Sequence, residues 1–214
     1  MPSFALPPVY PILDTATLDR IGFDLQIAAE AMIEGGALIL QLRHKSFWSR
    51  ELLHKAEKLG SFCKNAGVLF VINDRADYAA ILGSALHVGQ EDLTPADARR
   101  VVGAETIVGY STHNPAQMRE ADQEPADYLA FGPMFGTVSK ERPDPAVGLE
   151  GLRAIRPLTR KPLVAIGGIT RDNAFTCWNA GADSVAVIAD LYPPDCTKAR
   201  LRERMTEWQK LKPR

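Results

Sequence analysis

Short apolar runs alternate with amphipathic stretches along the whole chain. The runs predict eight strands, over residues 9–13, 37–42, 68–72, 85–88, 106–110, 127–131, 163–166 and 184–188. Strands this short and this uniformly apolar are typical of a parallel sheet that is buried on both faces. Most of the runs end in polar residues, so we expect these strands to meet solvent at their carboxyl ends.

The stretches between the runs predict eight helices. Apolar residues at three-four spacing mark one face of each, most clearly between Leu52 and Cys63. Gly67 follows that helix, as glycine often does at a helix end. Thr94-Pro95 has the residue types that open a helix, and Thr170 is the expected amino-terminal cap of the helix after residues 163–166.

This alternation decides the fold class. Strands that alternate with helices require a parallel sheet. Eight such units in 214 residues favour a closed (β/α)8 TIM barrel, formed as a single domain over residues 1–214. The sequence lacks the Gly-x-Gly-x-x-Gly fingerprint, which argues against an open dinucleotide-binding sheet.

The overall composition narrows the function classes. With 46% apolar residues, 24% charged residues and a formal net charge of -1, the chain has no basic field for nucleic acid or acidic membranes. No apolar run approaches the roughly 20 residues of a membrane span, and no secretory signal is evident, so we expect a cytoplasmic protein. The three cysteines show no Cys-x-x-Cys spacing, and Cys63 and Cys177 lie on apolar faces of expected helices, where packing is favoured over catalysis. A homo-oligomer remains open.

Two carboxylates follow neighbouring strands of the expected barrel. Asp74 comes just after residues 68–72, and Asp92 follows residues 85–88. Carboxylates at one rim suit a hard cation such as Mg2+, which prefers oxygen ligands and keeps several waters. The alternative is that each carboxylate caps the helix that follows it.

Cationic and amide side chains follow the second strand. Gln41, Arg43 and Lys45 alternate, so all three share one side if the strand continues to Lys45. Arginine binds phosphate in a bidentate manner, and lysine adds a point charge. A solvated strand exit is the alternative explanation for any one of them.

The last two strand ends match the place where barrels commonly bind phosphate. Gly167-Gly168 follows the seventh strand, and glycine lets backbone N–H groups approach an anion closely. The irregular segment 132–147 contains Thr137, Ser139 and Lys140 and has the length of a lid or binding loop. Together with the turn after the eighth strand, these features predict a second anion site.

The histidines provide no obvious general base. His87 is expected to be a hydrogen-bonded structural residue, and His44 and His54 are expected at the surface. His113 could contact substrate, but the sequence assigns it no acidic partner. The strand ends therefore predict a diphosphate bound with a cation on one side of the barrel mouth and a monophosphate on the other. Substitution of a diphosphate leaving group by a neutral nucleophile needs no base.

Five motifs, taken in order, resemble the thiamine-phosphate synthase family. They span roughly residues 9–191 and are the stretches Gln41-Leu42-Arg43-His44-Lys45, Asn73-Asp74-Arg75, His87-Val88-Gly89-Gln90-Glu91-Asp92, Gly132-Pro133 with Thr137-Val138-Ser139-Lys140, and Ala165-Ile166-Gly167-Gly168-Ile169-Thr170. Each motif alone is weak, but their joint occurrence is highly specific. The resemblance implies that hydroxymethylpyrimidine diphosphate is joined to a thiazole phosphate, carboxylated or not, which gives thiamine phosphate and pyrophosphate.

The resemblance also implies which residues carry each role. The pyrimidine diphosphate would be held by Gln41, Leu42, Arg43, His44, Lys45, Asn73, Ser111 and Lys140. Magnesium would be held by Asp74 and Asp92, and catalysis would fall to Arg43, Lys140 and Ser111. The thiazole phosphate would be held by Thr137, Val138, Ser139, Gly168, Ile188 and Ala189. Ala189 stands where family members often have serine, which leaves only backbone N–H groups at that contact.

Three alternatives to a synthase are open at this level. A thiazole tautomerase on the same fold resembles the synthase at the thiazole end but typically lacks the residues for the diphosphate and the metal. A non-catalytic sensor of a phosphate ligand would have no reason to retain two rim carboxylates. A phosphosugar isomerase would need an acid–base pair, and none can be assigned.

Overall fold

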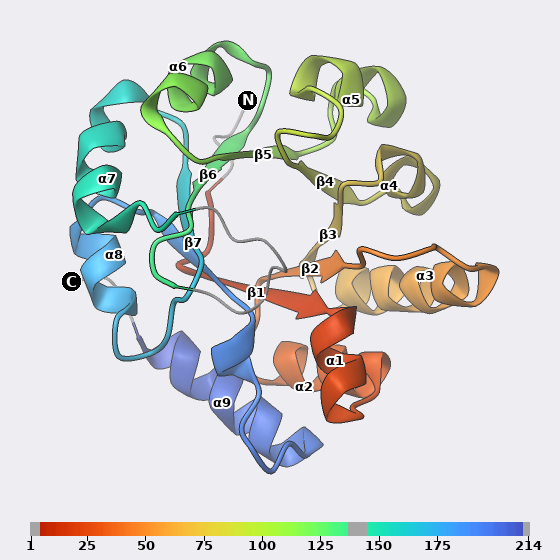
Figure 1. Cartoon of the computed structure of the whole chain (residues 1–214). Helices are drawn as coiled ribbons and strands as arrows, with labels where there is room; N and C mark the ends of the chain where they lie inside the picture. The colour runs from red at the N-terminus through yellow and green to blue at the C-terminus, as the bar shows by residue number, and fades with distance from the viewer. Residues whose placement is uncertain (1–4, 137–144, 212–214) are drawn as a thin grey trace.

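The protein is described by a computed structural model that covers residues 5–136 and 145–211. Eight parallel strands form a closed barrel in chain order, with β1 hydrogen-bonded to both β2 and β8. The helices lie outside the barrel (Figure 1). The strands are β1 Val9–Asp14, β2 Ile39–Arg43, β3 Leu69–Asn73, β4 Ala85–Val88, β5 Val108–Thr112, β6 Tyr128–Phe131, β7 Leu163–Ile166 and β8 Ser184–Val187. The predicted TIM barrel is confirmed.

The described residues contain nine α-helices and two short 3-10 helices. They are α1 Thr15–Ile21, α2 Leu25–Glu34, α3 Arg50–Asn65, α4 Ala76–Leu82, α5 Pro95–Val102, α6 Pro115–Gln123, α7 Gly148–Ile155, η1 Arg156–Leu158, α8 Ala174–Asn179, η2 Ala189–Leu191 and α9 Lys198–Lys210. Thr94 caps α5 as expected, because its hydroxyl accepts a hydrogen bond from Asp97 N and Pro95 is the first helical residue.

Side chains of each strand alternate between two apolar cores. One core fills the barrel and includes Ile12, Ile39 and Val71. The larger core lies between the strands and the helices, and Leu42 and Cys63 belong to it. Because the alternation is strict, the parity of a residue decides whether its side chain meets the barrel interior. Gln41 and Arg43 share the parity of Ile39.

The structure corrects three expectations about the helices and strands. The eight-helix pattern omitted α1, a polar turn of helix that Asp14 caps by accepting from Thr17 N at 2.9 Å. Thr170 is not a cap of α8, which begins at Ala174 after Asn173. The fifth strand is shifted toward Thr112, so Ser111 lies within β5 rather than after it.

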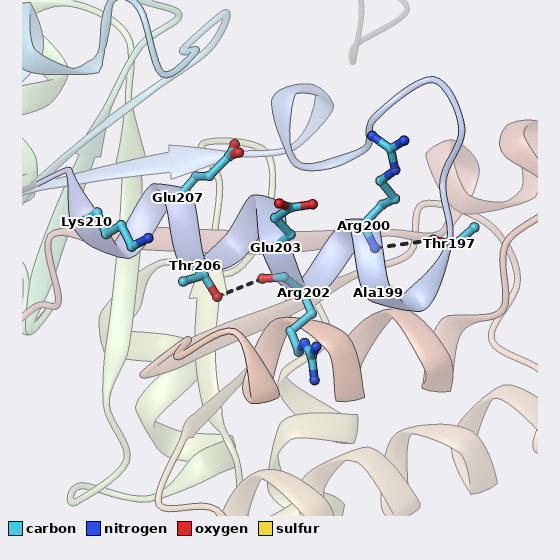
Figure 2. Close-up of a pocket in the computed structure, with 8 residues that line it drawn as sticks. All are labelled: Thr197, Ala199, Arg200, Arg202, Glu203, Thr206, Glu207 and Lys210. Carbon is cyan, nitrogen blue, oxygen red and sulfur yellow. Dashed lines mark hydrogen bonds between the residues drawn. The ribbon is translucent and has the colours of Figure 1, made fainter.

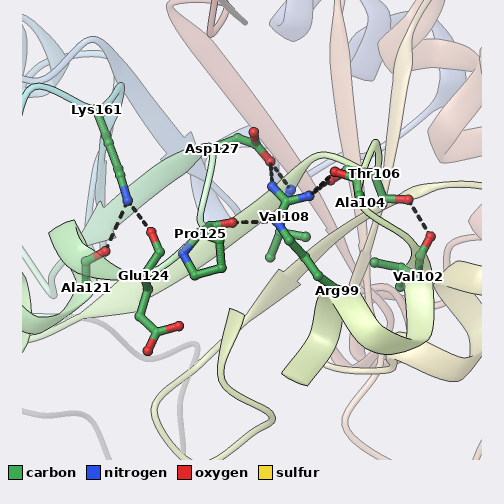
Figure 3. A network of polar contacts seen from close by, with 10 residues as sticks. All are labelled: Arg99, Val102, Ala104, Thr106, Val108, Ala121, Glu124, Pro125, Asp127 and Lys161. Carbon is green, nitrogen blue, oxygen red and sulfur yellow. Dashed lines mark hydrogen bonds and ion pairs between the residues drawn. The ribbon is translucent and has the colours of Figure 1, made fainter. Parts of the chain in front are cut away.

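A charged clasp closes the amino ends of β5 and β6. Asp127 accepts hydrogen bonds from Val108 N and from Arg99 Nη2, both at 2.7 Å. Arg99 also donates to the carbonyls of Thr106 at 2.9 Å and Pro125 at 2.6 Å (Figure 3). The clasp satisfies backbone groups that begin two adjacent strands.

The amino ends of β7 and β8 repeat this arrangement. Asp183 accepts from Leu163 N at 2.8 Å and from Arg156 Nη1 at 3.0 Å. Arg156 also donates to the carbonyls of Thr159 at 2.9 Å and Lys161 at 3.2 Å. Both clasps lie at the end of the barrel away from the candidate site.

Candidate active site

The first polar cluster at the carboxyl ends of the strands joins β1 to β2. Arg43 forms an ion pair with Asp14, whose carboxylate is almost fully buried and also caps α1. β2 ends at Arg43, so Lys45 lies beyond the strand. The strand therefore does not continue to Lys45, as a shared side for all three residues would require. Gln41 and Arg43 do share one side of β2.

Lys45 reaches the mouth by pairing with Asp74. Its Nζ lies 2.5 Å from Asp74 Oδ2. Asp74 has a left-handed backbone, with φ of 66°, and its N–H donates to the carbonyl of His87 at 2.8 Å. A left-handed conformation is uncommon for a residue with a side chain and often marks a functional position.

Asp92 lies beside Asp74. Its Oδ2 accepts from Gly89 N at 2.7 Å. Burial raises the pKa of Asp74, Lys45 opposes that change, and the neighbouring Asp92 carboxylate raises the pKa further. Two partly desolvated carboxylates that repel each other fit a divalent cation, because the cation would neutralise both. Within residues 5–136 and 145–211 no group of three acidic, histidine or cysteine ligands gathers, so such a cation would also need phosphate oxygens or water.

Asn73 adds a buried donor to this cluster. The residue is 6% exposed, and among the described residues its Nδ2 has no hydrogen-bond partner. A buried amide without a partner costs about 1–3 kcal/mol, so its presence favours a ligand that accepts from it.

A buried chain of hydrogen bonds connects Gln41 with Ser111 through the barrel interior. Gln41 Nε2 donates to the Tyr10 hydroxyl at 2.9 Å, and the hydroxyls of Tyr10 and Tyr128 lie 2.9 Å apart. His87 Nδ1 lies 3.1 Å from the Tyr128 hydroxyl, and His87 Nε2 lies 2.8 Å from Ser111 Oγ. Burial lowers the pKa of His87 to about 4, so its ring is neutral at physiological pH. The expectation of a hydrogen-bonded histidine is confirmed.

Leu42 and His44 lie at the same rim, but neither side chain is free to contact a ligand there. The Leu42 side chain is fully buried in the outer core, so only its backbone could contact a substrate. His44 Nδ1 lies 2.7 Å from the Thr15 hydroxyl, and His44 Nε2 lies 3.1 Å from the carbonyl of Phe47. The half-buried His44 is thus held in place by its neighbours and is not a free surface residue.

The turn after β7 is shaped by two glycines. Gly167 and Gly168 have φ of 99° and 66°, a region that side chains rarely adopt. A Cβ on Gly168 would lie 2.5 Å from the carbonyl oxygen of Gly136. Ile188 packs against the barrel interior, and exposed Ala189 begins η2. The two glycines therefore leave room for the backbone of the segment after β6 to pack against this turn.

The described ends of the segment after β6 are anchored beside that turn. Met134 N donates to the carbonyl of Ile166 at 2.8 Å, and Val147 N donates to that of Pro133 at 2.8 Å. His113 Nδ1 lies 2.7 Å from the carbonyl oxygen of Gly132, so this histidine is held by backbone. The expected binding residues Thr137, Val138, Ser139 and Lys140 lie outside the described residues.

A surface hollow of about 650 Å³ lies elsewhere, on α9 (Figure 2). Arg200, Glu203, Glu207 and Lys210 line it, so it has charges of both signs. Glu207 already pairs with Arg171 and Arg204. The hollow offers none of the convergent polar chemistry found at the strand ends.

Comparison with known proteins decides between the alternatives. A family model described as thiamine monophosphate synthase matches residues 9–191. The chain belongs to this family. The match covers both groups of strand ends, and the relatives of known name support the synthase alternative over the tautomerase and the sensor.

Individual relatives of the thiamine-phosphate synthase family agree over nearly the whole chain. The chain is 50% identical to the thiamine-phosphate synthase of Koribacter versatilis, over 87% of this chain and 89% of that one. It is 41% identical to that of Chloroflexus aurantiacus, over 90% and 88%. The structure of thiamine phosphate pyrophosphorylase from Pyrococcus furiosus superposes with a TM-score of 0.79 at 31% identity, and covers 94% of this chain and 93% of that one. Within the described residues, no helix combines the length and apolarity needed to cross a membrane.

Three residues in or beside the candidate site were not among those expected from the sequence. Asp14 holds Arg43 by an ion pair. Tyr10 and Tyr128 were counted as apolar residues, although their hydroxyls meet in the barrel interior. Their positions on the inward-facing side of a strand could have indicated this, but the pairing of distant strands could not be inferred from periodicity.

Proposed function

We propose that this member of the thiamine-phosphate synthase family joins hydroxymethylpyrimidine diphosphate to thiazole phosphate and releases pyrophosphate. The observation that carries this assignment is the cluster at the ends of β2, β3 and β4. It combines the cations Arg43 and Lys45 with the adjacent carboxylates Asp74 and Asp92. A diphosphate needs both cations and a metal, whereas a thiazole phosphate alone needs neither.

The residues beside the metal would bind the diphosphate. Asp74 and Asp92 would hold Mg2+, which when bound supplies positive charge to the departing pyrophosphate. Arg43 would bind phosphate oxygens, with Asp14 fixing the direction of its guanidinium. Lys45 would add a second charge, and Asn73 Nδ2 would donate its unused hydrogen bond.

Gln41 on β2 and Ser111 on β5, which pairs with β4, would orient the pyrimidine ring. The ring carries an amino group and ring nitrogens, which are a donor and acceptors. The Gln41 side chain offers a carbonyl oxygen, and Ser111 offers a hydroxyl. Correct orientation matters because the methylene carbon must face the incoming nitrogen.

The other side of the mouth would hold the thiazole phosphate. Gly168, Ile188 and Ala189 would supply backbone N–H groups, and Thr137, Val138 and Ser139 would approach from the segment after β6. Lys140 would approach the pyrophosphate from the same segment. As the carbon–oxygen bond breaks, the aminopyrimidine ring would stabilise the methylene cation, and the thiazole nitrogen would attack that cation with its own lone pair, so the chain needs no general base. The electron pair of that bond leaves with pyrophosphate.

Pyrophosphate release tests this proposal. Purified protein is assayed with pyrimidine diphosphate, thiazole phosphate and Mg2+, and each component is omitted in turn. We expect pyrophosphate and thiamine phosphate in equal amounts, and only when all three are present. Tight binding of thiazole phosphate without release of pyrophosphate would contradict the proposal and favour a tautomerase or a sensor.

The place of action and the choice of metal are also proposals. We propose that the enzyme works in the cytoplasm with Mg2+ as its cation, with a homo-oligomer left open. Support comes from the balanced charge of the chain and from the hard oxygen ligands at the mouth. We expect pyrophosphate release with Mg2+ and none with Zn2+ at the same concentration.

A further inference from the structure

The hydrogen-bonded chain inside the barrel is a built feature of the fold. It runs from Gln41 through Tyr10, Tyr128 and His87 to Ser111, and these residues come from five different strands. Tyr10, Tyr128 and His87 are nearly or fully buried. We call this set of five residues the interior relay.

A glycine makes room for the relay. A Cβ on Gly109 would lie 2.1 Å from Cζ of Tyr128 and 2.5 Å from Nδ1 of His87. The two rings instead stack across this position, with centroids 5.5 Å apart. Every other residue type would force Tyr128 away from His87, so the backbone of β5 is shaped around their contact.

The donors and acceptors of the relay fit one direction. Gln41 Nε2 donates to the Tyr10 oxygen, and each phenol has a single proton to pass on. With that amide orientation, an unbroken series has Tyr10 donating to Tyr128, Tyr128 donating to His87 Nδ1, and His87 Nε2–H donating to Ser111 Oγ, across heavy-atom distances of 2.9, 3.1 and 2.8 Å. The opposite direction would bring two donors to the Tyr10 oxygen and leave the proton of Tyr10 out of the chain.

This direction fixes what the two ends offer to a ligand. Gln41 uses its amide nitrogen inside the barrel, so its Oε1 is left as an acceptor. Ser111 accepts from His87, so its own O–H is left as a donor. A flip of the glutamine amide would require every proton along the chain to reverse, which couples the two ends.

We propose that Tyr10, Tyr128 and His87 are positioning residues that set Gln41 as an acceptor and Ser111 as a donor for the pyrimidine ring. This inference rests on the proposed function. The ends of the relay then match a ring with an amino donor and a ring-nitrogen acceptor. They oppose a ring in which a carbonyl replaces the amino group, because that carbonyl would face Gln41 Oε1.

The test removes single hydroxyl groups from the relay. Tyr128→Phe and Tyr10→Phe are compared with Tyr192→Phe, a matched control whose buried hydroxyl has no hydrogen-bond partner within the described part of the chain. Two quantities are measured: KM and kcat for each substrate, and Ki for unphosphorylated pyrimidine analogues that carry an amino group or a carbonyl.

We expect each relay variant to lose about tenfold in kcat/KM for the pyrimidine diphosphate, the size of one buried neutral hydrogen bond. The KM for thiazole phosphate should stay unchanged, and the preference for the amino analogue should narrow by a similar factor. Tyr192→Phe should match the wild type. The double variant should lose little more than either single variant, because both cut one chain.

Other outcomes separate the two proposals. An active wild type whose relay variants keep its kinetic constants and its analogue preference would overturn the positioning role alone. So would equal losses toward both substrates, which a merely structural role predicts. A wild type that forms no thiamine phosphate would overturn the proposed function and this inference with it. If Tyr128→Phe does not fold, Tyr10→Phe decides, since it cuts the next link.

Discussion

The two ends of the barrel use the same residue types in opposite ways. At the amino end, Asp127 and Asp183 each accept from a strand N–H and from an arginine that also binds carbonyl groups. At the carboxyl end, Asp74 and Asp92 lie beside each other, and Asn73 Nδ2 has no partner within residues 5–136 and 145–211. The comparison teaches that each carboxylate at the amino end is neutralised by its own arginine, whereas Asp74 and Asp92 lie against each other and leave negative charge for a ligand to neutralise.

The largest effect is expected from removing a charge at the carboxyl end. Asp92→Asn keeps an oxygen that can accept from Gly89 N but loses the negative charge at the proposed cation site. We expect turnover in Mg2+ to fall by about 10²–10³-fold, the range seen when one electrostatic contact to a transition state is lost. Steady-state kinetics over a Mg2+ titration measure the change.

Asp97→Asn is the control for this substitution. Asp97 is a half-exposed carboxylate on α5 that pairs with Arg100. It should keep wild-type kinetics. Full Mg2+-dependent turnover in Asp92→Asn would remove Asp92 from the metal site and leave it as a structural cap.

The second effect should appear in stability and not in catalysis. Arg99→Ala leaves Asp127 and the strand-start carbonyls without their donor, which should lower the free energy of unfolding by about 2–4 kcal/mol. Denaturant titration measures this loss, and kcat/KM should remain unchanged. Arg100→Ala, whose side chain is 82% exposed on the same helix, should stay within about 0.5 kcal/mol of the wild type. A large kinetic defect in Arg99→Ala would contradict the division between the two ends.

The third effect concerns pH, because the interior relay holds a histidine that resists protonation. The pKa of His87 is about 4 in the folded protein and about 6.5 in an unfolded chain. Between pH 7 and pH 5 the unfolded chain gains a proton that the folded protein does not bind. Folding should therefore lose about 2 kcal/mol over this range from His87 alone.

Unfolding titrations at several pH values check this loss. His87→Gln should show a shallower decline toward acid pH than the wild type. His54→Gln, at an exposed position on α3, should decline as the wild type does. Equal slopes for all three proteins would mean that His87 is protonated in the folded state.

The smallest effect is expected at the second anion site. Ala189→Ser would add a hydroxyl to the backbone N–H groups proposed to bind the thiazole phosphate. We expect the KM for thiazole phosphate to fall by about threefold, because an exposed hydrogen bond contributes less than 1 kcal/mol. Ala199→Ser on α9 is the matched control, and an unchanged KM in Ala189→Ser would place the phosphate elsewhere.

Sequence patterns located the strands because most of them are short apolar runs, and the one that was shifted, β5, has the polar residues Ser111 and Thr112 at its end. A short apolar run such as Leu163–Ile166, which follows Lys161 and precedes Gly167, is typical of a buried strand and too short for a helix. The helix α1 was missed because its residues are mostly polar and Asp14 alone signals its start. The cap of α8 was misplaced because Asn173 and Thr170 are both good capping residues, and only the turn geometry selects between them.

The sequence predicted the part of the candidate site that is formed by residues just after neighbouring strands. Asp74 and Asp92 follow adjacent strands, so the rule that strand ends meet at one rim is enough to bring them together. The interior relay could not be found this way. Tyr10 and Tyr128 lie 118 positions apart and meet only because both point inward across a closed barrel. Gly109 was a further local sign, but its meaning depends on the two rings beside it.

The clasps at the amino end also help to determine which side chains face the barrel interior. Asp127 holds the first amide of β5 and Asp183 holds the first amide of β7, so each clasp fixes how far one strand has advanced along its neighbour. A slip of a single residue exchanges the inside and outside of a strand. A slip of β6 would turn Tyr128 toward the helices and bring Leu129 into the barrel. The contacts that set the strand register of the candidate site therefore lie at the amino end of the barrel, opposite that site.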